Sequence, residues 1–275
     1  MTTQTATPDR PPEETPPQYS LAKILGIWAA AAIPMAILGW IVAPSLAPDL
    51  ASDPIGAAVA RVGLLTLGLI WQFALSMIIV YREEGDLRWA TVRRRLWLNT
   101  PRDPKTGEPR ARLWLWLVPL LILVALLDVA LAPALGGLWV SLFPFFAEPP
   151  GFAFGTALGL PKVQAQLVGN WGFLALFVVF ALFNTVLGEE FLFRGVLLPK
   201  MKGVFGKWDW VANGVLFGVY HLHQPWGLLT SVIGGVFLLA LPARRFRSTW
   251  MAIIVHSGQS VFLLFLILGL VLGLA

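Results

Sequence analysis

Seven apolar runs of spanning length follow one another along the chain, separated by short polar segments. They cover about residues 24–46, 57–81, 113–135, 171–198, 208–224, 226–242 and 249–273. A bilayer requires roughly 20 predominantly apolar residues per helix, so each run is close to the length needed to cross it. The pattern predicts an all-α, polytopic membrane helix bundle of about seven transmembrane helices, or eight if the connection at 136–170 also crosses.

The first twenty residues depart from this pattern, because they are rich in Pro, Thr and Glu and contain almost nothing apolar. Such a segment cannot bury enough apolar surface to offset the entropy lost on ordering. It also lacks the basic start and apolar core of a signal peptide. We therefore expect a disordered cytoplasmic tail over 1–20 and one membrane domain over 21–275, whose helices pack together to bury the polar side chains they carry.

Composition supports a membrane location, since only 13% of the residues are charged, against roughly 25% in soluble domains. The basic residues gather in short connections. Nine of them lie in 82–112, whereas the connection around Asp49 and Asp53 has none, so the positive-inside rule places 82–112 in the cytoplasm. Counting helices onward puts two further basic clusters on the same side: Lys200, Lys202 and Lys207, and then Arg244, Arg245 and Arg247.

This topology places the N-terminus in the cytoplasm and both the C-terminus and 136–170 outside. The positive-inside rule explains where the basic residues lie, so the net charge of +5 does not indicate a nucleic-acid partner. The expected surroundings of the protein are the lipid bilayer. The absence of eukaryotic targeting signals favours a multi-pass protein of a bacterial cell membrane.

Ionisable residues within the apolar runs are few and concentrated. Each costs about 2.5 to 3.5 kcal/mol at the centre of a membrane helix and needs a partner or a role. At a rise of 1.5 Å per residue, Glu189 lies roughly 16 Å from Lys200, His221 roughly 20 Å from Lys207 and His256 roughly 14 Å from Arg247. Three helices therefore bring polar groups to a similar depth, as an active site or ion site requires.

The helical spacing assigns provisional roles to the acidic residues. Glu190 and Arg194 are four apart with the acid first, which is the preferred geometry of a helical ion pair, so a structural role is favoured for both. Glu189 points about 100° away around the helix and is left for chemistry as a general base or acid. The chain has no cysteine, which excludes disulfides, thiolate metal sites and cysteine nucleophiles.

The spacing of the histidines leaves a choice open. His221 and His223 are two residues apart and are expected to face opposite sides of a helix, so only one of them should reach the site. Phe217 shares the face of His221, where it would either exclude water or simply pack in the core. Ser260 shares the face of His256 and would donate a hydrogen bond either to a substrate oxygen or to its own helix backbone.

Three motifs, GEEFLFRGVL, FGVYHLHQPW and IIVHSGQS, occur in this order on successive apolar runs and resemble the CPBP family of intramembrane proteases, which includes the CAAX prenyl endopeptidases and bacteriocin-processing relatives. The resemblance covers about 170–265. It implies Glu189 as the residue that activates water, selects His221 over His223, and gives His256 a catalytic role. Ser260 stands where the family usually has asparagine. Glu190, Arg194 and Phe217 match the supporting motif positions.

The resemblance implies an intramembrane endopeptidase that hydrolyses a peptide bond of a membrane-associated peptide or protein, prenylated substrates included. Glu189, His221 and His256 form a carboxylate and imidazole set of the kind that binds zinc with an open position for water. The family is described both as metalloproteases and as metal-independent glutamate proteases, so zinc and no cofactor stay alternatives.

Two other functions compete with proteolysis. The first is a non-catalytic membrane scaffold or bacteriocin-immunity protein of the same fold, for which Ser260 in place of asparagine is the best support. The second is a proton-coupled or ion transporter that uses Glu189 and Asp128, although Asp128 is more simply explained by a bond to a neighbouring helix.

Overall fold

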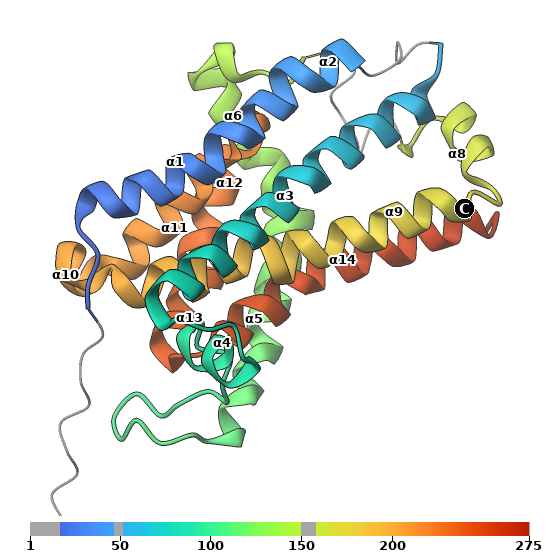
Figure 1. The fold of residues 1–275 in the computed structure, drawn as a ribbon. Helices are drawn as coiled ribbons and strands as arrows, with labels where there is room; N and C mark the ends of the chain where they lie inside the picture. The colour runs from blue at the N-terminus through green and yellow to red at the C-terminus, as the bar shows by residue number, and fades with distance from the viewer. Residues whose placement is uncertain (1–16, 47–51, 150–157, 275) are drawn as a thin grey trace, which may run out of the picture.

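A computed structural model describes residues 17–46, 52–149 and 158–274, and it is all-helical over these ranges. Six helical stretches are long and apolar enough to cross a membrane, by length and composition: Leu21–Leu46, Pro54–Glu84, Ala111–Leu142, Trp171–Lys200, Pro225–Phe246 and Thr249–Val271. Figure 1 shows most of them running side by side along one diagonal of the molecule. The predicted polytopic helix bundle is confirmed.

Several of these stretches change helix type along their length, and the α-helical parts carry the labels of Figure 1. The first three stretches comprise α1 (Leu21–Ile37) and α2 (Ala43–Leu46), then α3 (Pro54–Glu84), then α5 (Leu117–Leu126) and α6 (Ala132–Leu142). The last three comprise α9 (Trp171–Leu182), then α12 (Leu228–Ile233) and α13 (Leu241–Phe246), then α14 (Thr249–Val271). Shorter helices connect them: α4 (Trp89–Arg95), α8 (Pro161–Leu167) and α10 (Lys202–Phe205).

The predicted run 208–224 differs most from expectation. Its helix α11 spans only Asp209–Tyr220 and is followed by a 3₁₀ turn at His221–His223. Twelve residues rise about 18 Å, which is less than a bilayer core, so α11 makes a shorter passage than the six candidate spans. The third span is longer than predicted, since it continues to Leu142 and takes up the start of 136–170.

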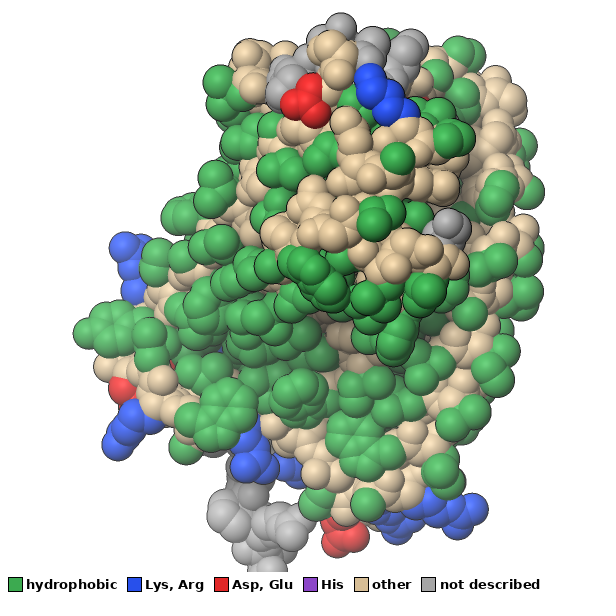
Figure 2. Space-filling model, turned by 90° about the vertical axis from the view of Figure 1, so that its right-hand side faces the viewer, with side chains coloured by type: hydrophobic (Ala, Val, Ile, Leu, Met, Phe, Trp, Pro, Cys, Tyr) green, Lys and Arg blue, Asp and Glu red, His purple; other side chains and the backbone are tan. Residues whose placement is uncertain are grey.

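The three basic clusters predicted to share one side do lie at the same end of the bundle. The backbone amide of Arg102 donates to the carbonyl of Phe246 (2.8 Å), and Asp209 binds Arg244 (2.6 Å). The helix α14 ends at the opposite end, beside α8, where the amide of Gly169 donates to the carbonyl of Val271 (2.8 Å; Figure 1). Figure 2 shows one face of the molecule covered mainly by hydrophobic side chains, with Lys and Arg confined to its margins. This distribution is that of a multi-pass membrane protein.

Most of the predicted tail, residues 1–16, lies outside the described residues. The remainder is packed against the bundle, which corrects the boundary at residue 20. Tyr19 is buried, its amide donates to the carbonyl of Lys200 (2.9 Å) and its hydroxyl donates to Glu83 (2.6 Å). Burial raises the pKa of the Tyr19 hydroxyl well above its usual range, so it stays a neutral donor.

Backbone contact between α11 and the stretch that contains α12 depends on glycine. A Cβ atom added at Gly214 would lie 2.4 Å from the Cα of Val236. Small residues let membrane helices approach this closely, and van der Waals packing then holds them together. The GxxxG spacing of Gly214 and Gly218 therefore fixes α11 against its neighbour.

We expect Gly214→Ala to destabilise the protein by about 1 to 3 kcal/mol, because the added methyl group meets backbone that cannot rotate away. Thermal unfolding of the detergent-solubilised protein measures the change. Gly63→Ala in α3 is the matched control, since a Cβ there meets nothing within 4 Å. Equal unfolding temperatures for the two variants would contradict the close approach.

Candidate active site

The two glutamates lie between two π-helical segments of the Trp171–Lys200 span, Phe183–Gly188 and Phe191–Leu197. Widened helical turns of this kind are rare and are often found at functional sites. Gly188, directly before Glu189, packs on α3, and a Cβ there would lie 2.8 Å from the carbonyl oxygen of Leu69. The local widening and this close approach position Glu189 and Glu190 in the interior of the bundle, where both are buried.

Glu190 is held by two partners. One Glu190 oxygen, Oε1, accepts from Arg194 Nη1 (3.0 Å) and pairs with His256 Nδ1 (2.9 Å). The guanidinium of Arg194 also stacks on the ring of Phe217, with 4.0 Å from its central carbon to the ring centroid. The predicted Glu190–Arg194 pair is present, and the structure adds His256 to it. Sequence spacing could not reveal this bond, because His256 comes from α14.

Glu189 faces the other side of the same imidazole. Its Oε2 lies 3.8 Å from His256 Nε2 and has no hydrogen-bond partner among the described residues. In the tautomer that donates its Nδ1 hydrogen to Glu190, the imidazole presents its Nε2 lone pair toward Glu189. Glu189 Oε2 and His256 Nε2 are 3.8 Å apart. A single water whose oxygen lies about 2.8 Å from each atom can donate one hydrogen to each of them. The pair is thus arranged to hold a water molecule.

Tyr220 and Gln72 complete the surroundings of Glu189, and sequence reasoning missed both. Gln72 Nε2 donates to the Tyr220 hydroxyl (2.7 Å), and this hydroxyl interacts with Glu189. All three side chains are buried. Gln72 lies on α3, outside the motif-bearing segment, and its only sequence signal is a polar residue within an apolar run.

His221 lies at the edge of this cluster and is partly exposed. Its Nδ1 is 2.9 Å from the carbonyl of Phe217, which can only accept, so the neutral ring keeps Nε2 as an acceptor. The Phe217 ring contacts both His221 and His256, with centroid separations of 4.8 and 5.9 Å. The aromatic side chain predicted to share the face of His221 therefore contacts both imidazoles.

The expectation that His221 and His223 face opposite sides is wrong. Their rings stack, with centroids 5.5 Å apart and planes 28° from parallel. The α-helix ends at Tyr220, and the 3₁₀ turn that follows changes the angle between the two side chains. His223 is nevertheless turned away from the glutamates, since its Nε2 is 3.1 Å from Gln224 Nε2 and its Cβ packs on Gly39.

Ser260 is buried one helical turn after His256 on α14. Asp128, the residue considered for transport, accepts a hydrogen bond from Gln259 Nε2 (2.6 Å), the neighbouring-helix bond that was the simpler explanation. The structure therefore groups Glu189, Glu190, Arg194, Phe217 and His256 tightly, with His221 and Ser260 around them.

Zinc binding by Glu189, His221 and His256 stays a prediction. Within the described residues, no group of three or more His, Cys, Asp or Glu side chains is placed to hold a metal ion. Nδ1 of each imidazole faces an oxygen acceptor, which leaves both Nε2 atoms as acceptors, and the ring of Phe217 lies against both imidazoles. We therefore derive the chemistry of the site from its side chains alone.

A family model described as type II CAAX prenyl endopeptidase Rce1-like matches residues 170–262. The match begins at the N-cap of α9, ends within α14 and includes all the residues predicted for the site. No curated protein and no solved structure matches the chain.

Proposed function

We propose that this chain is an endopeptidase that cleaves a membrane-associated peptide or protein with water activated by Glu189, because residues 170–262 match a family model of type II CAAX prenyl endopeptidases. The observation that carries the proposal is the pairing of Glu189 Oε2 with His256 Nε2 across 3.8 Å, inside the bundle. The family match supports membrane proteolysis, and the geometry supports the assignment of roles.

Glu189 would act as the general base. Its unpartnered Oε2 accepts a proton from the bound water while the water oxygen attacks the scissile carbonyl carbon. The carboxyl group then returns this proton to the departing amide nitrogen as the C–N bond breaks, so the products are a free amine and a carboxylic acid that keeps the second hydrogen of the water. The Tyr220 hydroxyl, itself bound by Gln72, interacts with the Glu189 side chain and would restrain it.

Glu190 and Arg194 would position His256 rather than react. Arg194 donates to Glu190 Oε1, and the same oxygen holds the Nδ1 hydrogen of His256, so that Nε2 stays directed at the water. This is the orienting role that a buried carboxylate plays toward a catalytic histidine. Ser260, one turn further along α14, is the hydroxyl we assign to the oxyanion that forms during attack.

The proposal is tested by incubating the purified protein with membrane-tethered peptides, each made with and without a prenylated cysteine. We expect cleavage of at least one peptide. Preference within a matched pair then reports whether the prenyl group is recognised. Absence of all cleavage by demonstrably folded protein would overturn the proposal and favour a scaffold or immunity protein of this fold.

Metal dependence is a separate prediction. Because the side chains alone account for water activation, we expect a chelator such as EDTA to leave the cleavage rate unchanged. Cleavage that is lost with chelator and restored by added zinc would show that the zinc set Glu189, His221 and His256 forms in the active protein.

We expect His221→Gln to reduce kcat of cleavage by about 10²-fold, within the usual contribution of a positioned proton-transfer or hydrogen-bonding group. His221 is partly exposed beside Phe217, so its Nε2 can meet the substrate. His223→Gln is the matched control, because His223 is turned toward Gln224, and its kcat should change by less than about threefold. A larger loss from the His223 variant would reverse the assignment.

A further inference from the structure

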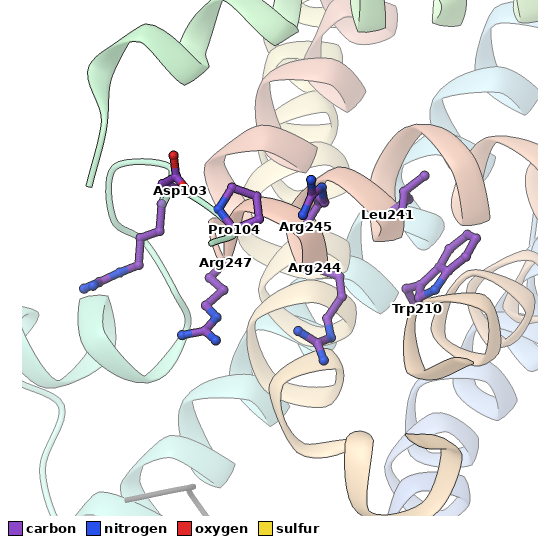
Figure 3. Close-up of a pocket in the computed structure, with 8 residues that line it drawn as sticks. Asp103, Pro104, Trp210, Leu241, Arg244, Arg245 and Arg247 are labelled. Carbon is purple, nitrogen blue, oxygen red and sulfur yellow. The ribbon is translucent and has the colours of Figure 1, made fainter. Parts of the chain in front are cut away.

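The basic end of the bundle contains two adjoining pockets, with volumes of about 540 and 250 Å³. They share Arg102, Arg244 and Arg247, and together we name them the basic basin. Figure 3 shows Arg244 and Arg247 extending in the same direction, with Trp210 at the far side of the smaller pocket. A volume of 540 Å³ falls in the range of pockets that bind small molecules.

Segments distant in the sequence build the basin. The residues after α4 are tied to the α13–α14 connection by a row of hydrogen bonds. Ser248 Oγ donates to the Asn99 carbonyl (2.6 Å), and the amide of Thr249 donates to the Trp97 carbonyl (2.9 Å). These bonds hold the two connections together, so the basin belongs to the tertiary structure. The positive-inside rule explains the charge of each connection separately, but it does not explain why the connections meet.

The charge of the lining is strongly unbalanced. Seven basic side chains line the two pockets: Arg93, Arg94, Arg102, Lys202, Arg244, Arg245 and Arg247. The acidic lining residues are Asp103 and Asp209, and arginines already bind both: Arg110 at 3.0 Å and Arg244 at 2.6 Å. Arg94 also pairs with Glu84 (2.6 Å). Basic side chains still outnumber acidic ones in the lining by seven to two, which makes the basin attractive to an anion.

Backbone strain marks the same place. Trp97 and Arg247 are the two non-glycine residues with positive φ in the described ranges, at 53° and 47°. Side chains other than glycine rarely adopt this conformation, and where they do the strain is often tied to a function. Both residues line the basin, so the strained backbone directs an indole and a guanidinium toward it.

We propose that the basic basin binds the phosphate headgroup of an anionic phospholipid. Spans end at Glu84, Lys200 and Phe246 and begin at Ala111 and Thr249 around the basin, so it opens where a bilayer has its headgroups. Arginine matches phosphate through paired N–H donors, and the indoles of Trp97 and Trp210 suit the interface. A lipid is favoured over a soluble anion because the basin lies at the ends of membrane helices.

The test uses the full chain in nanodiscs of phosphatidylcholine, with spin-labelled phosphatidylglycerol as the probe. The basin variant is Arg93→Gln, Lys202→Gln and Arg245→Gln combined. The control is Arg82→Gln, Lys105→Gln and Arg112→Gln combined, which removes the same charge from exposed positions outside the basin. Thermal unfolding confirms that both variants fold.

We expect the basin variant to lose at least tenfold in affinity for phosphatidylglycerol and the control less than twofold. Equal losses in both variants would show that affinity depends on the net charge of the protein and not on the basin, which would overturn the proposal. Displacement of the probe by millimolar inorganic phosphate would overturn the lipid assignment in favour of a soluble anion. Neither readout involves cleavage, so the outcome is independent of the proposed protease activity.

Discussion

Replacement of Glu189 by glutamine is expected to reduce kcat for peptide cleavage by about 10² to 10⁴-fold, the usual contribution of a general base. Glutamine keeps the size and shape of the side chain and can still meet Tyr220, but it cannot accept a proton from water. Since Glu189 Oε2 faces His256 Nε2 directly, no neighbouring carboxylate can take over: Glu190 is committed to Arg194 and His256.

The matched control for this experiment is Asp128→Asn. It also removes a carboxylate from within a membrane span, and asparagine can keep the bond to Gln259. We expect cleavage by this variant to change by less than about threefold, well below the effect of losing a general base. Full activity in Glu189→Gln would overturn the assigned mechanism, and a large loss in Asp128→Asn would give that residue a role which the proposal does not include.

Loss of the buried cation at Arg194 is expected to produce the largest change in stability. Arg194→Leu leaves the fully buried Glu190 without its guanidinium partner, and breaking a buried ion pair in this way costs about 3 to 5 kcal/mol. Denaturant titration of the detergent-solubilised protein measures the loss. Activity should fall with it, because Glu190 then loses one of the two partners that fix its Oε1 beside His256 Nδ1.

Two further variants separate charge pairing from packing. Glu190→Gln combined with Arg194→Leu removes both charges and should recover part of the lost stability. Arg88→Leu breaks an exposed pair with Asp86 and should change stability by less than about 1 kcal/mol. If Arg194→Leu unfolds like wild type, the ion pair contributes nothing measurable to the fold.

The local pattern of the chain was sufficient for the fold class and for most of the candidate site. Apolar runs of bilayer length can satisfy their backbone hydrogen bonds only as helices, so the membrane bundle and the approximate positions of six spans follow from composition and length. Ionisable residues are so costly in such runs that Glu189, Glu190, Arg194 and His256 stood out without any structure. The i,i+4 ion pair was also predictable, because both partners lie on one helix.

Other features depended on contacts between distant segments. The bond from His256 to Glu190, the link from Gln72 through Tyr220 to Glu189, and the convergence of the basic basin each join helices whose relative rotation no sequence period specifies. The stacking of His221 on His223 depended on where α11 ends and the 3₁₀ turn begins, which no helix period along the sequence marks. Periodicity along one helix determines which side chains share a face, and only tertiary packing decides which faces meet.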